Sequence, residues 1–176
     1  AADIINNAIE CKSKIALLFD TDSDGISSGA IIYRYLKQYS VNITPFIDHG
    51  KQHGLQRDEL DRYKPFQILI IVDSLDSTAY LYEEVQIKSN ITDIIVLDHH
   101  AINEKIPYDK WITLVSSQRD YGNPQLSGAG VTWKFCKYLD KINGTNFADY
   151  LVDLAATGII ADMMDMTVPE NRYIRS

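Results

Sequence analysis

The sequence is poor in cysteine and in the patterns through which cysteine usually acts. Its two cysteines, Cys11 and Cys136, lie far apart and belong to neither a CxxC nor a CxxH pair. A disulfide framework and a cysteine-based zinc site therefore have no support in the sequence.

Long apolar runs and glycine-rich nucleotide-binding motifs are also absent. No apolar stretch reaches the roughly 18 residues that a membrane span needs, and residues 1–14 lack the basic-then-apolar order of a signal peptide. Neither the GxGxxG fingerprint of dinucleotide-binding domains nor the P-loop pattern occurs. We expect a soluble, cytoplasmic protein without a membrane partner.

Basic residues are fewer than acidic ones. The 17 Lys and Arg residues stand against 24 Asp and Glu residues, which gives a formal net charge of −7. Because Lys and Arg hold phosphate backbones, this balance at first argues against a nucleic-acid partner. Divalent ions bound by clustered carboxylates reverse the local sign, however, so the net charge does not decide the substrate.

The residues that are present describe a folded domain with several strands. Of the 176 residues, 45% are hydrophobic and 23% are charged, as in ordinary globular proteins of one domain. Strands are predicted by five apolar runs, at 15–20, 41–48, 67–73, 93–98 and 111–116. Three of these runs are almost wholly apolar and β-branched, which is typical of strands covered on both faces of a parallel sheet.

Helical spacing fills the intervals between the strands and the rest of the chain. The helices are predicted at 26–39, 77–90, 127–139 and 146–165. In the first of them, one stripe contains Ile26, Ala30, Tyr33 and Leu36. We expect an α/β fold, a mainly parallel five-stranded sheet flanked by helices, with a strand–helix core at about 14–116 and a helical part at about 117–176.

Acidic residues stand where three of the apolar strands end. Asp20, Asp73 and Asp98 are each the first charged residue after a run of buried side chains. The carboxyl ends of parallel strands share one edge of the sheet, and ligands bind in the crevice at that edge. The three carboxylates should therefore converge.

Two of these strand ends carry further polar residues. The segment DTDSDG adds Asp22 and Asp24 to the first, and Asp98 is followed by His99 and His100. Carboxylates and imidazoles at one edge make a plausible site for Mn²⁺ or Mg²⁺. The alternative for any single Asp is that it caps the helix that follows.

Two other readings of DTDSDG fail on single positions. An EF-hand calcium loop needs Glu at its twelfth position, where this chain has Ile31, and an apolar strand precedes the segment. A haloacid-dehalogenase-like phosphatase has Thr or Val where this chain has Asp24. We therefore set both readings aside.

Four segments, in order, resemble the four motifs of the DHH phosphoesterases, and within them the RecJ-like exonucleases. The motif-like segments are DTDSDGISSGA (20–30), IVDS (71–74), VLDHH (96–100) and GIIADMMDM (158–166). LSGAGVTWKF (126–135) also resembles the Gly-rich helix start of RecJ-like members, and HGL (53–55) their short Gly-Leu loop. The resemblance covers nearly the whole chain and identifies residues 1–176 as a DHH domain.

The resemblance implies hydrolysis of phosphodiester bonds with two divalent metal ions, Mn²⁺ before Mg²⁺. Matching positions imply the metal ligands Asp22, Asp24, Asp73, His99 and Asp162, with Asp73 bridging the two ions.

Three further positions receive a role from the same resemblance. Asp20 is either a further ligand or a group that supports one. His100 would contact the scissile phosphate, and Asp98 would orient a histidine. His100 and Asp98 are thus the expected catalytic residues.

Substrate contacts are less specific. Ser127, Gly128 and Gly130 could begin a helix whose NH groups hold a phosphate, or they could form a plain helix cap with tight packing. Arg119 and His53 are further candidates. The loop around His53 reads DHGKQHGL, whereas RecJ-like members usually carry an Arg and a Gly-Tyr there, so substrate contacts from it are in doubt.

The resemblance favours an exonuclease that degrades single-stranded DNA from the 5′ end in repair or recombination. The alternatives are a phosphodiesterase for oligoribonucleotides or cyclic dinucleotides, and a DHH scaffold that binds without cleaving. Members that became scaffolds lose motif acids, whereas this chain retains them. The DHH-associated C-terminal domain has no counterpart in the sequence, so we expect a piece of a longer chain that binds metal but cleaves weakly alone.

Overall fold

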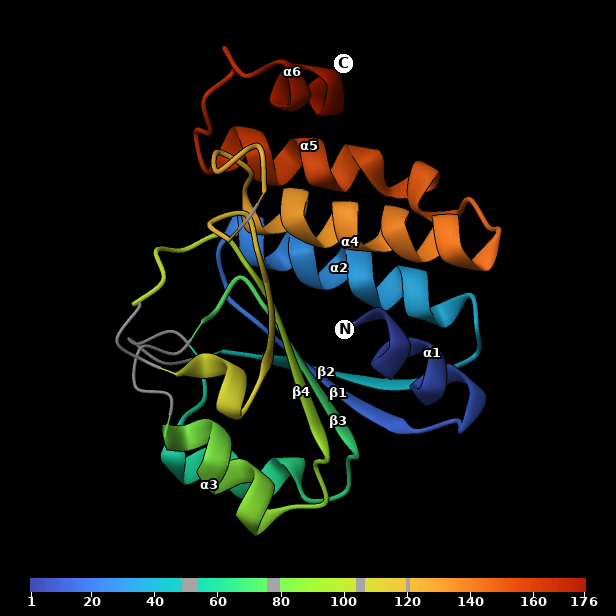
Figure 1. The fold of residues 1–176 in the computed structure, drawn as a ribbon, viewed down its shortest axis with the longest axis vertical. Coiled ribbons are helices and arrows are strands. Elements are labelled where there is room, and N and C mark those ends of the chain that lie inside the picture. Colours follow the sequence, from blue (N-terminus) through green and yellow to red (C-terminus); the bar gives the residue numbers. More distant parts are fainter. Residues whose placement is uncertain (49–53, 76–79, 104–106, 120) are drawn as a thin grey trace.

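The structure is a computed structural model that describes residues 1–48, 54–75, 80–103, 107–119 and 121–176. Its centre is a five-stranded sheet with the strand order β2-β1-β3-β4-β5, in which every neighbouring pair is parallel (Figure 1). The strands are β1 (Lys14–Phe19), β2 (Asn42–Ile47), β3 (Ile68–Val72), β4 (Asp93–Asp98) and β5 (Thr113–Ser116). The expected α/β fold with a parallel five-stranded sheet is confirmed.

The composition of each strand matches its place in the sheet. All residues of β3, with the sequence ILIIV, are buried, as a central strand covered on both faces requires. The edge strand β2 instead alternates between exposed and buried residues and contains Pro45. Proline has no NH for the ladder, so an edge is where a strand tolerates it.

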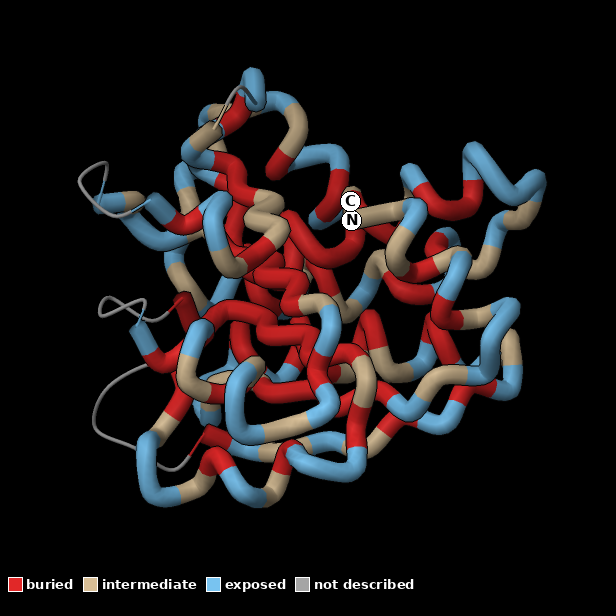
Figure 2. Tube along the Cα trace, turned by 60° about the horizontal axis from the view of Figure 1, so that its bottom comes forward, coloured by how far each residue is buried: buried red, intermediate tan, exposed pale blue. Residues whose placement is uncertain are grey.

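Helices cover both faces of the sheet. One face is covered by α1 (Ala2–Glu10), α2 (Ser23–Lys37) and α4 (Gly128–Asn143), and α5 (Val152–Ala161) packs on α2 and α4 as an outer layer. The other packs against α3 (Tyr80–Lys88) and two 3₁₀ helices, η1 (Arg57–Tyr63) and η2 (Tyr108–Lys110). Figure 1 shows α2, α4 and α5 stacked in layers on one side and α3 on the other. The buried residues form a continuous centre under an exposed outer shell (Figure 2).

The helix α2 buries only part of the stripe expected at 26–39, in which Leu36 is fully buried. Ile26 is 52% exposed, and Tyr33 is only partly buried. The face that packs on β1 is instead rich in small residues, and a Cβ on Gly29 would lie 2.7 Å from the ring of Phe19. The same face also carries Ile31, Ile32 and Tyr35, so the expected stripe was wrong for Ile26 and Tyr33.

The segment 146–165 is not one helix. It forms the 3₁₀ helix η3 (Phe147–Leu151) followed by α5, and α6 (Pro169–Arg175) comes later. α5 ends because Met163 adopts a left-handed φ of 50°, after which the Met164 NH donates to the Ile159 carbonyl at 3.0 Å. Neither Gly nor Pro marks this end. Among the described residues, no helix has the length and apolarity to cross a membrane.

Candidate metal centre

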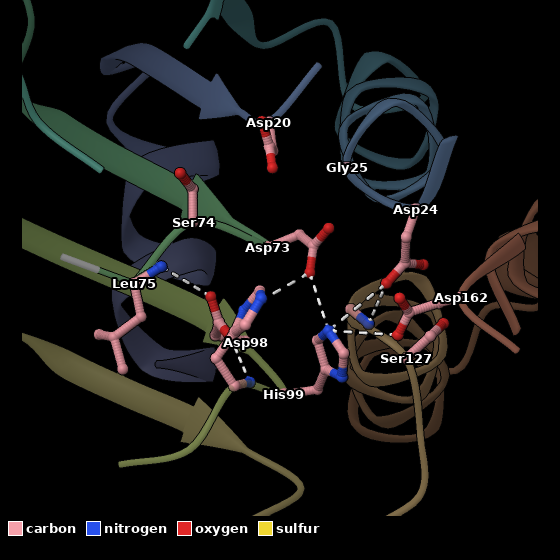
Figure 3. Close-up of polar contacts among 12 residues, drawn as sticks. Asp20, Asp24, Gly25, Asp73, Ser74, Leu75, Asp98, His99, Ser127 and Asp162 are labelled. Carbon is pink, nitrogen blue, oxygen red and sulfur yellow. Dashed lines mark hydrogen bonds and ion pairs between the residues drawn. The ribbon is translucent and has the colours of Figure 1, made fainter. Parts of the chain in front are cut away.

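Acidic and histidine side chains from four elements meet at the carboxyl edge of the sheet (Figure 3). Asp73 follows β3, His99 follows β4, Asp24 lies in the first turn of α2, and Asp162 follows α5. The Nε2 atom of His99 lies 3.3 Å from Asp73 Oδ1 and 3.8 Å from Asp24 Oδ2. The same atom lies 3.7 Å from Asp162 Oδ2. One imidazole thus faces three carboxylates.

These side chains make two groups that could each hold a metal ion. One comprises Asp73, His99 and His100, the other Asp24, His99 and Asp162, and in each the ligand atoms lie within 4.8 Å of one another. His99 belongs to both. Carboxylate oxygen and imidazole nitrogen together suit Mn²⁺, and the oxygens also suit Mg²⁺.

Asp73 has an orphaned atom that fits such an ion. Its Oδ1 is buried and accepts no well-formed hydrogen bond from the described residues, although His99 lies 3.3 Å away. Burial raises the pKa of Asp73 to about 7, opposed by His99 and reinforced by the charges of Asp24 and Asp98. Burial also raises the pKa of Asp24. Burial therefore disfavours the ionised form of both carboxylates, and a bound cation would favour it.

The backbone at Asp73 is strained in a way that often marks functional sites. Its φ is 54°, a left-handed value that costs a residue with a side chain about 1–3 kcal/mol. The Asp73 NH still donates to the Leu97 carbonyl at 3.0 Å. The backbone therefore stays hydrogen-bonded to β4 up to this NH and turns away from the sheet after it. The turn brings the carboxylate beside His99 (Figure 3).

The N-terminus of α4 is occupied by a carboxylate of this chain. Asp24 accepts hydrogen bonds from the NH groups of Gly128, at 2.6 Å, and Ala129, at 3.0 Å. The NH of Gly130 donates to the Ser127 side chain at 3.3 Å. The helix start that we expected to offer to a phosphate therefore lies at the site but directs these NH groups to Asp24 and Ser127. Its dipole favours the ionised form of Asp24, against the effect of burial.

Two glycines allow the helices to come this close. A Cβ on Gly128 would lie 2.7 Å from Cγ of Asp73, and one on Gly158 would overlap Oδ1 of Asp24 and lie 2.5 Å from the Cβ of Ala129. Glycine is therefore required at both positions by the approach of α4 and α5 to the two carboxylates.

Asp98 lies behind the cluster and holds His100. Its Oδ1 accepts the NH of His100 at 2.6 Å and the ring Nδ1–H at 2.8 Å, and its Oδ2 accepts the NH of Leu75 at 2.7 Å. The hydrogen bond to Asp98 raises the pKa of His100 to about 9, against the effect of burial. Burial would raise the pKa of Asp98, but the hydrogen bonds and charge of His100 outweigh it and lower that pKa. The pair is therefore ionised at neutral pH.

The other two motif acids lie outside both ligand groups. Asp22 is exposed and caps α2, since its Oδ1 accepts the NH of Gly25 at 2.8 Å. Asp20 accepts the NH of Thr21 at 2.6 Å, and Figure 3 shows it at the end of β1 beside the cluster. The structure thus gives Asp22 the capping role that is the alternative for any strand-end Asp.

The remaining substrate candidates do not meet the cluster among the described residues. Arg119 forms an ion pair with Asp109 at 2.8 Å. His53 lies outside the described residues. Sequence reasoning also missed Asp48, which follows β2 and is 3% exposed. The sequence signal that points to Asp20 also applies to Asp48, because both acids stand at the end of a predicted strand.

Comparison with known proteins gives the family. The sequence model of the DHH family, N-terminal domain, matches residues 14–159, most of the chain. The chain belongs to the DHH family. This confirms the resemblance carried by the four motifs.

Two curated relatives of this DHH chain come from Bacillus subtilis (strain 168). The SPbeta prophage-derived protein YorK is 33% identical over 98% of the chain, which spans 30% of YorK. The single-stranded-DNA-specific exonuclease RecJ is 30% identical over 99% of the chain, which spans 22% of RecJ. The DHH chain thus spans less than a third of the length of either relative.

Solved structures share the DHH fold. An exonuclease RecJ bound to manganese superposes with a TM-score of 0.85 at 23% identity, covering 98% of this chain and 44% of that one. RecJ from Thermus thermophilus in complex with Mn²⁺ gives a TM-score of 0.79 at 24% identity, covering 98% of this chain and 25% of that one. At these identities the likeness establishes the fold alone.

Proposed function

We propose that this DHH domain is the metal-bearing part of an exonuclease that hydrolyses single-stranded DNA from the 5′ end, in repair or recombination, with two divalent ions, Mn²⁺ in first place. The observation that carries the proposal is the convergence of three carboxylates on Nε2 of His99, with Asp73 at 3.3 Å, Asp162 at 3.7 Å and Asp24 at 3.8 Å. The relative named as a single-stranded-DNA-specific exonuclease, RecJ, supports the choice of substrate.

In this proposal the residues of the cluster have different roles. Asp24, Asp73, His99 and Asp162 would hold the metal ions. Asp20, at the end of β1 beside the cluster, and Asp22, at the start of α2, are further candidates. Divalent ions in such a site activate water and stabilise the charge of an in-line phosphoryl displacement. His100 is half-exposed and, with a pKa raised to about 9 by Asp98, carries a positive charge at neutral pH. It would contact the scissile phosphate and offset its charge.

We expect most contacts to the nucleic acid to be made by a part of the protein outside this chain. Two basic side chains that could contact a phosphate are already paired, Lys134 with Glu170 at 2.9 Å and Arg119 with Asp109 at 2.8 Å. The relatives are more than three times as long as the matched region. We therefore expect a C-terminal substrate-binding domain to supply the second wall of the groove, and this chain alone to bind metal with weak, non-processive cleavage.

The test is digestion of 5′-labelled and 3′-labelled single-stranded DNA and RNA, from dinucleotides to about 40 nucleotides, with and without Mn²⁺. We expect Mn²⁺-dependent release of mononucleotides from the 5′ end of DNA, and its loss in Asp73→Ala. The matched control is Asp140→Ala, since Asp140 is equally buried but lies between α2, α4 and η3, away from the cluster.

Three outcomes would contradict the proposal. Cleavage confined to short RNA would favour the oligoribonucleotide phosphodiesterase. Strand binding without any cleavage, in a protein that carries its C-terminal domain, would favour the scaffold. Full activity of Asp73→Ala would show that this cluster is not the active site.

A further inference from the structure

Asp48 is a buried carboxylate at the end of the edge strand β2. Among the described residues, its Oδ2 accepts hydrogen bonds from the NH of Gly54 at 2.9 Å and from the hydroxyl of Ser74 at 3.0 Å. Its own NH donates to the carbonyl of Phe19, at 2.9 Å, where β1 ends. Because β2 and β3 lie on either side of β1, the contact between Asp48 and Ser74 passes over the end of β1.

Ser74 is the residue directly after Asp73 and is fully buried. Its hydroxyl donates to Asp48 and accepts the NH of Gly54 at 2.8 Å, so three groups close one small network. Gly54 adopts a φ of 92°, which a residue with a side chain rarely reaches. The network therefore fixes the Ser74 side chain.

The turn that carries Asp73 is thus held from both sides by buried carboxylates. Asp48 from β2 binds Ser74, and Asp98 from β4 accepts the NH of Leu75 at 2.7 Å (Figure 3). Between these two contacts Asp73 keeps its left-handed φ of 54°. Such a conformation persists only where its surroundings over-determine it.

We propose that Asp48 is a positioning residue for the metal centre, which acts through Ser74 to keep Asp73 aimed at His99. The inference rests on the proposed function and adds a residue to it. A metal site depends on the groups that orient its ligands, and loss of one such group typically costs about 10–100-fold in metal affinity. The burial of Ser74 beside a carboxylate, one residue from Asp73, is what this role requires.

The experiment titrates Mn²⁺ into the purified chain and follows free Mn²⁺ by electron paramagnetic resonance. Asp48→Asn keeps the size of the side chain and removes its charge, and Ser74→Ala removes only a hydroxyl. The matched control is Asp140→Asn, because Asp140 is 2% exposed and also accepts a backbone NH, from Ala148 at 2.8 Å. Thermal unfolding without metal is measured for every variant.

We expect Asp48→Asn and Ser74→Ala each to weaken Mn²⁺ binding about tenfold or more, and the double variant to lose little beyond the weaker-binding single one. Asp140→Asn should lower the melting temperature while its Mn²⁺ affinity stays within about twofold of the parent. If Asp48→Asn does not fold, the Mn²⁺ affinity of Ser74→Ala alone tests the positioning role.

Parental affinity in folded Ser74→Ala and Asp48→Asn would overturn the positioning role and leave the metal centre standing. Failure of the unaltered chain to bind Mn²⁺ would instead overturn the metal centre, and the positioning role with it.

Discussion

Gly158 is the position where one added methyl group should damage the site most directly. In Gly158→Ala the new Cβ would overlap Oδ1 of Asp24 and lie 2.5 Å from the Cβ of Ala129. Asp24 cannot move away freely, because two backbone NH groups at the start of α4 hold it and it is buried. The collision therefore strains the contact between α4 and α5 and displaces a proposed metal ligand.

The expected magnitude follows from two opposing effects. Replacing glycine by alanine inside a helix gains about 1 kcal/mol. Overpacking a tight contact costs about 1–3 kcal/mol, and disturbing the hydrogen bonds to a buried carboxylate costs about 1.5–3 kcal/mol for each bond lost. With one of the two hydrogen bonds lost, the costs outweigh the gain, and Gly158→Ala should lower the free energy of unfolding by about 1.5–5 kcal/mol.

The assay is urea denaturation without metal, together with Mn²⁺ titration of the folded variant. Gly122→Ala is the matched control, because a Cβ at Gly122 meets nothing within 4 Å. It should match the parent in both measurements, whereas Gly158→Ala should bind Mn²⁺ about tenfold or more weakly. A Gly158→Ala protein as stable as the parent, with parental Mn²⁺ affinity, would refute the close approach of α5 to Asp24.

Three further predictions use single residues. Burial raises the pKa of Asp73 to about 7. Without metal, the stability that protonated Asp73 contributes is therefore present in acid and is lost as the pH rises towards 7. Mn²⁺ binds the ionised carboxylate, so Mn²⁺ affinity should fall as the pH drops below 7, by up to about tenfold per pH unit. Titration between about pH 5.5 and 8 checks this, and a flat profile would contradict it. In Asp98→Asn the pKa of His100 should fall from about 9 towards 6.5, as measured by NMR of the imidazole; an unchanged value would mean that Asp98 is not its partner. A thiol reagent should modify exposed Cys11 in the native chain and spare Cys136, which is buried and whose thiol pKa is raised by that burial; equal rates would contradict the packing of α4.

The strands were predictable because their signal is local. Buried parallel strands read as unbroken apolar runs, and β3 and β4 begin and end within one residue of the predicted limits. Helix ends were harder. The end of α5 depends on a left-handed Met163, and the break before it on a 3₁₀ turn, and no glycine or proline marks either one.

Convergence of the acids was predictable from topology, but their individual contacts were not. Strand ends in a parallel sheet meet at one edge, so Asp73 and His99 could be expected together. The hydrogen bond that the NH of Gly128 donates to Asp24 joins residues 104 positions apart, and only packing of α2 on α4 creates it. Asp22 has the same residue type as Asp24 but caps its own helix, because the first turn of α2 points the two side chains in different directions.

The most direct test of the account is the number of Mn²⁺ ions that the isolated chain binds, compared with Asp73→Ala. The account predicts two ions per chain at neutral pH, and a marked loss of binding in Asp73→Ala with Asp140→Ala unaffected. The absence of Mn²⁺ binding by the parent, or equal binding by parent and Asp73→Ala, would contradict the assignment of the cluster as a metal centre.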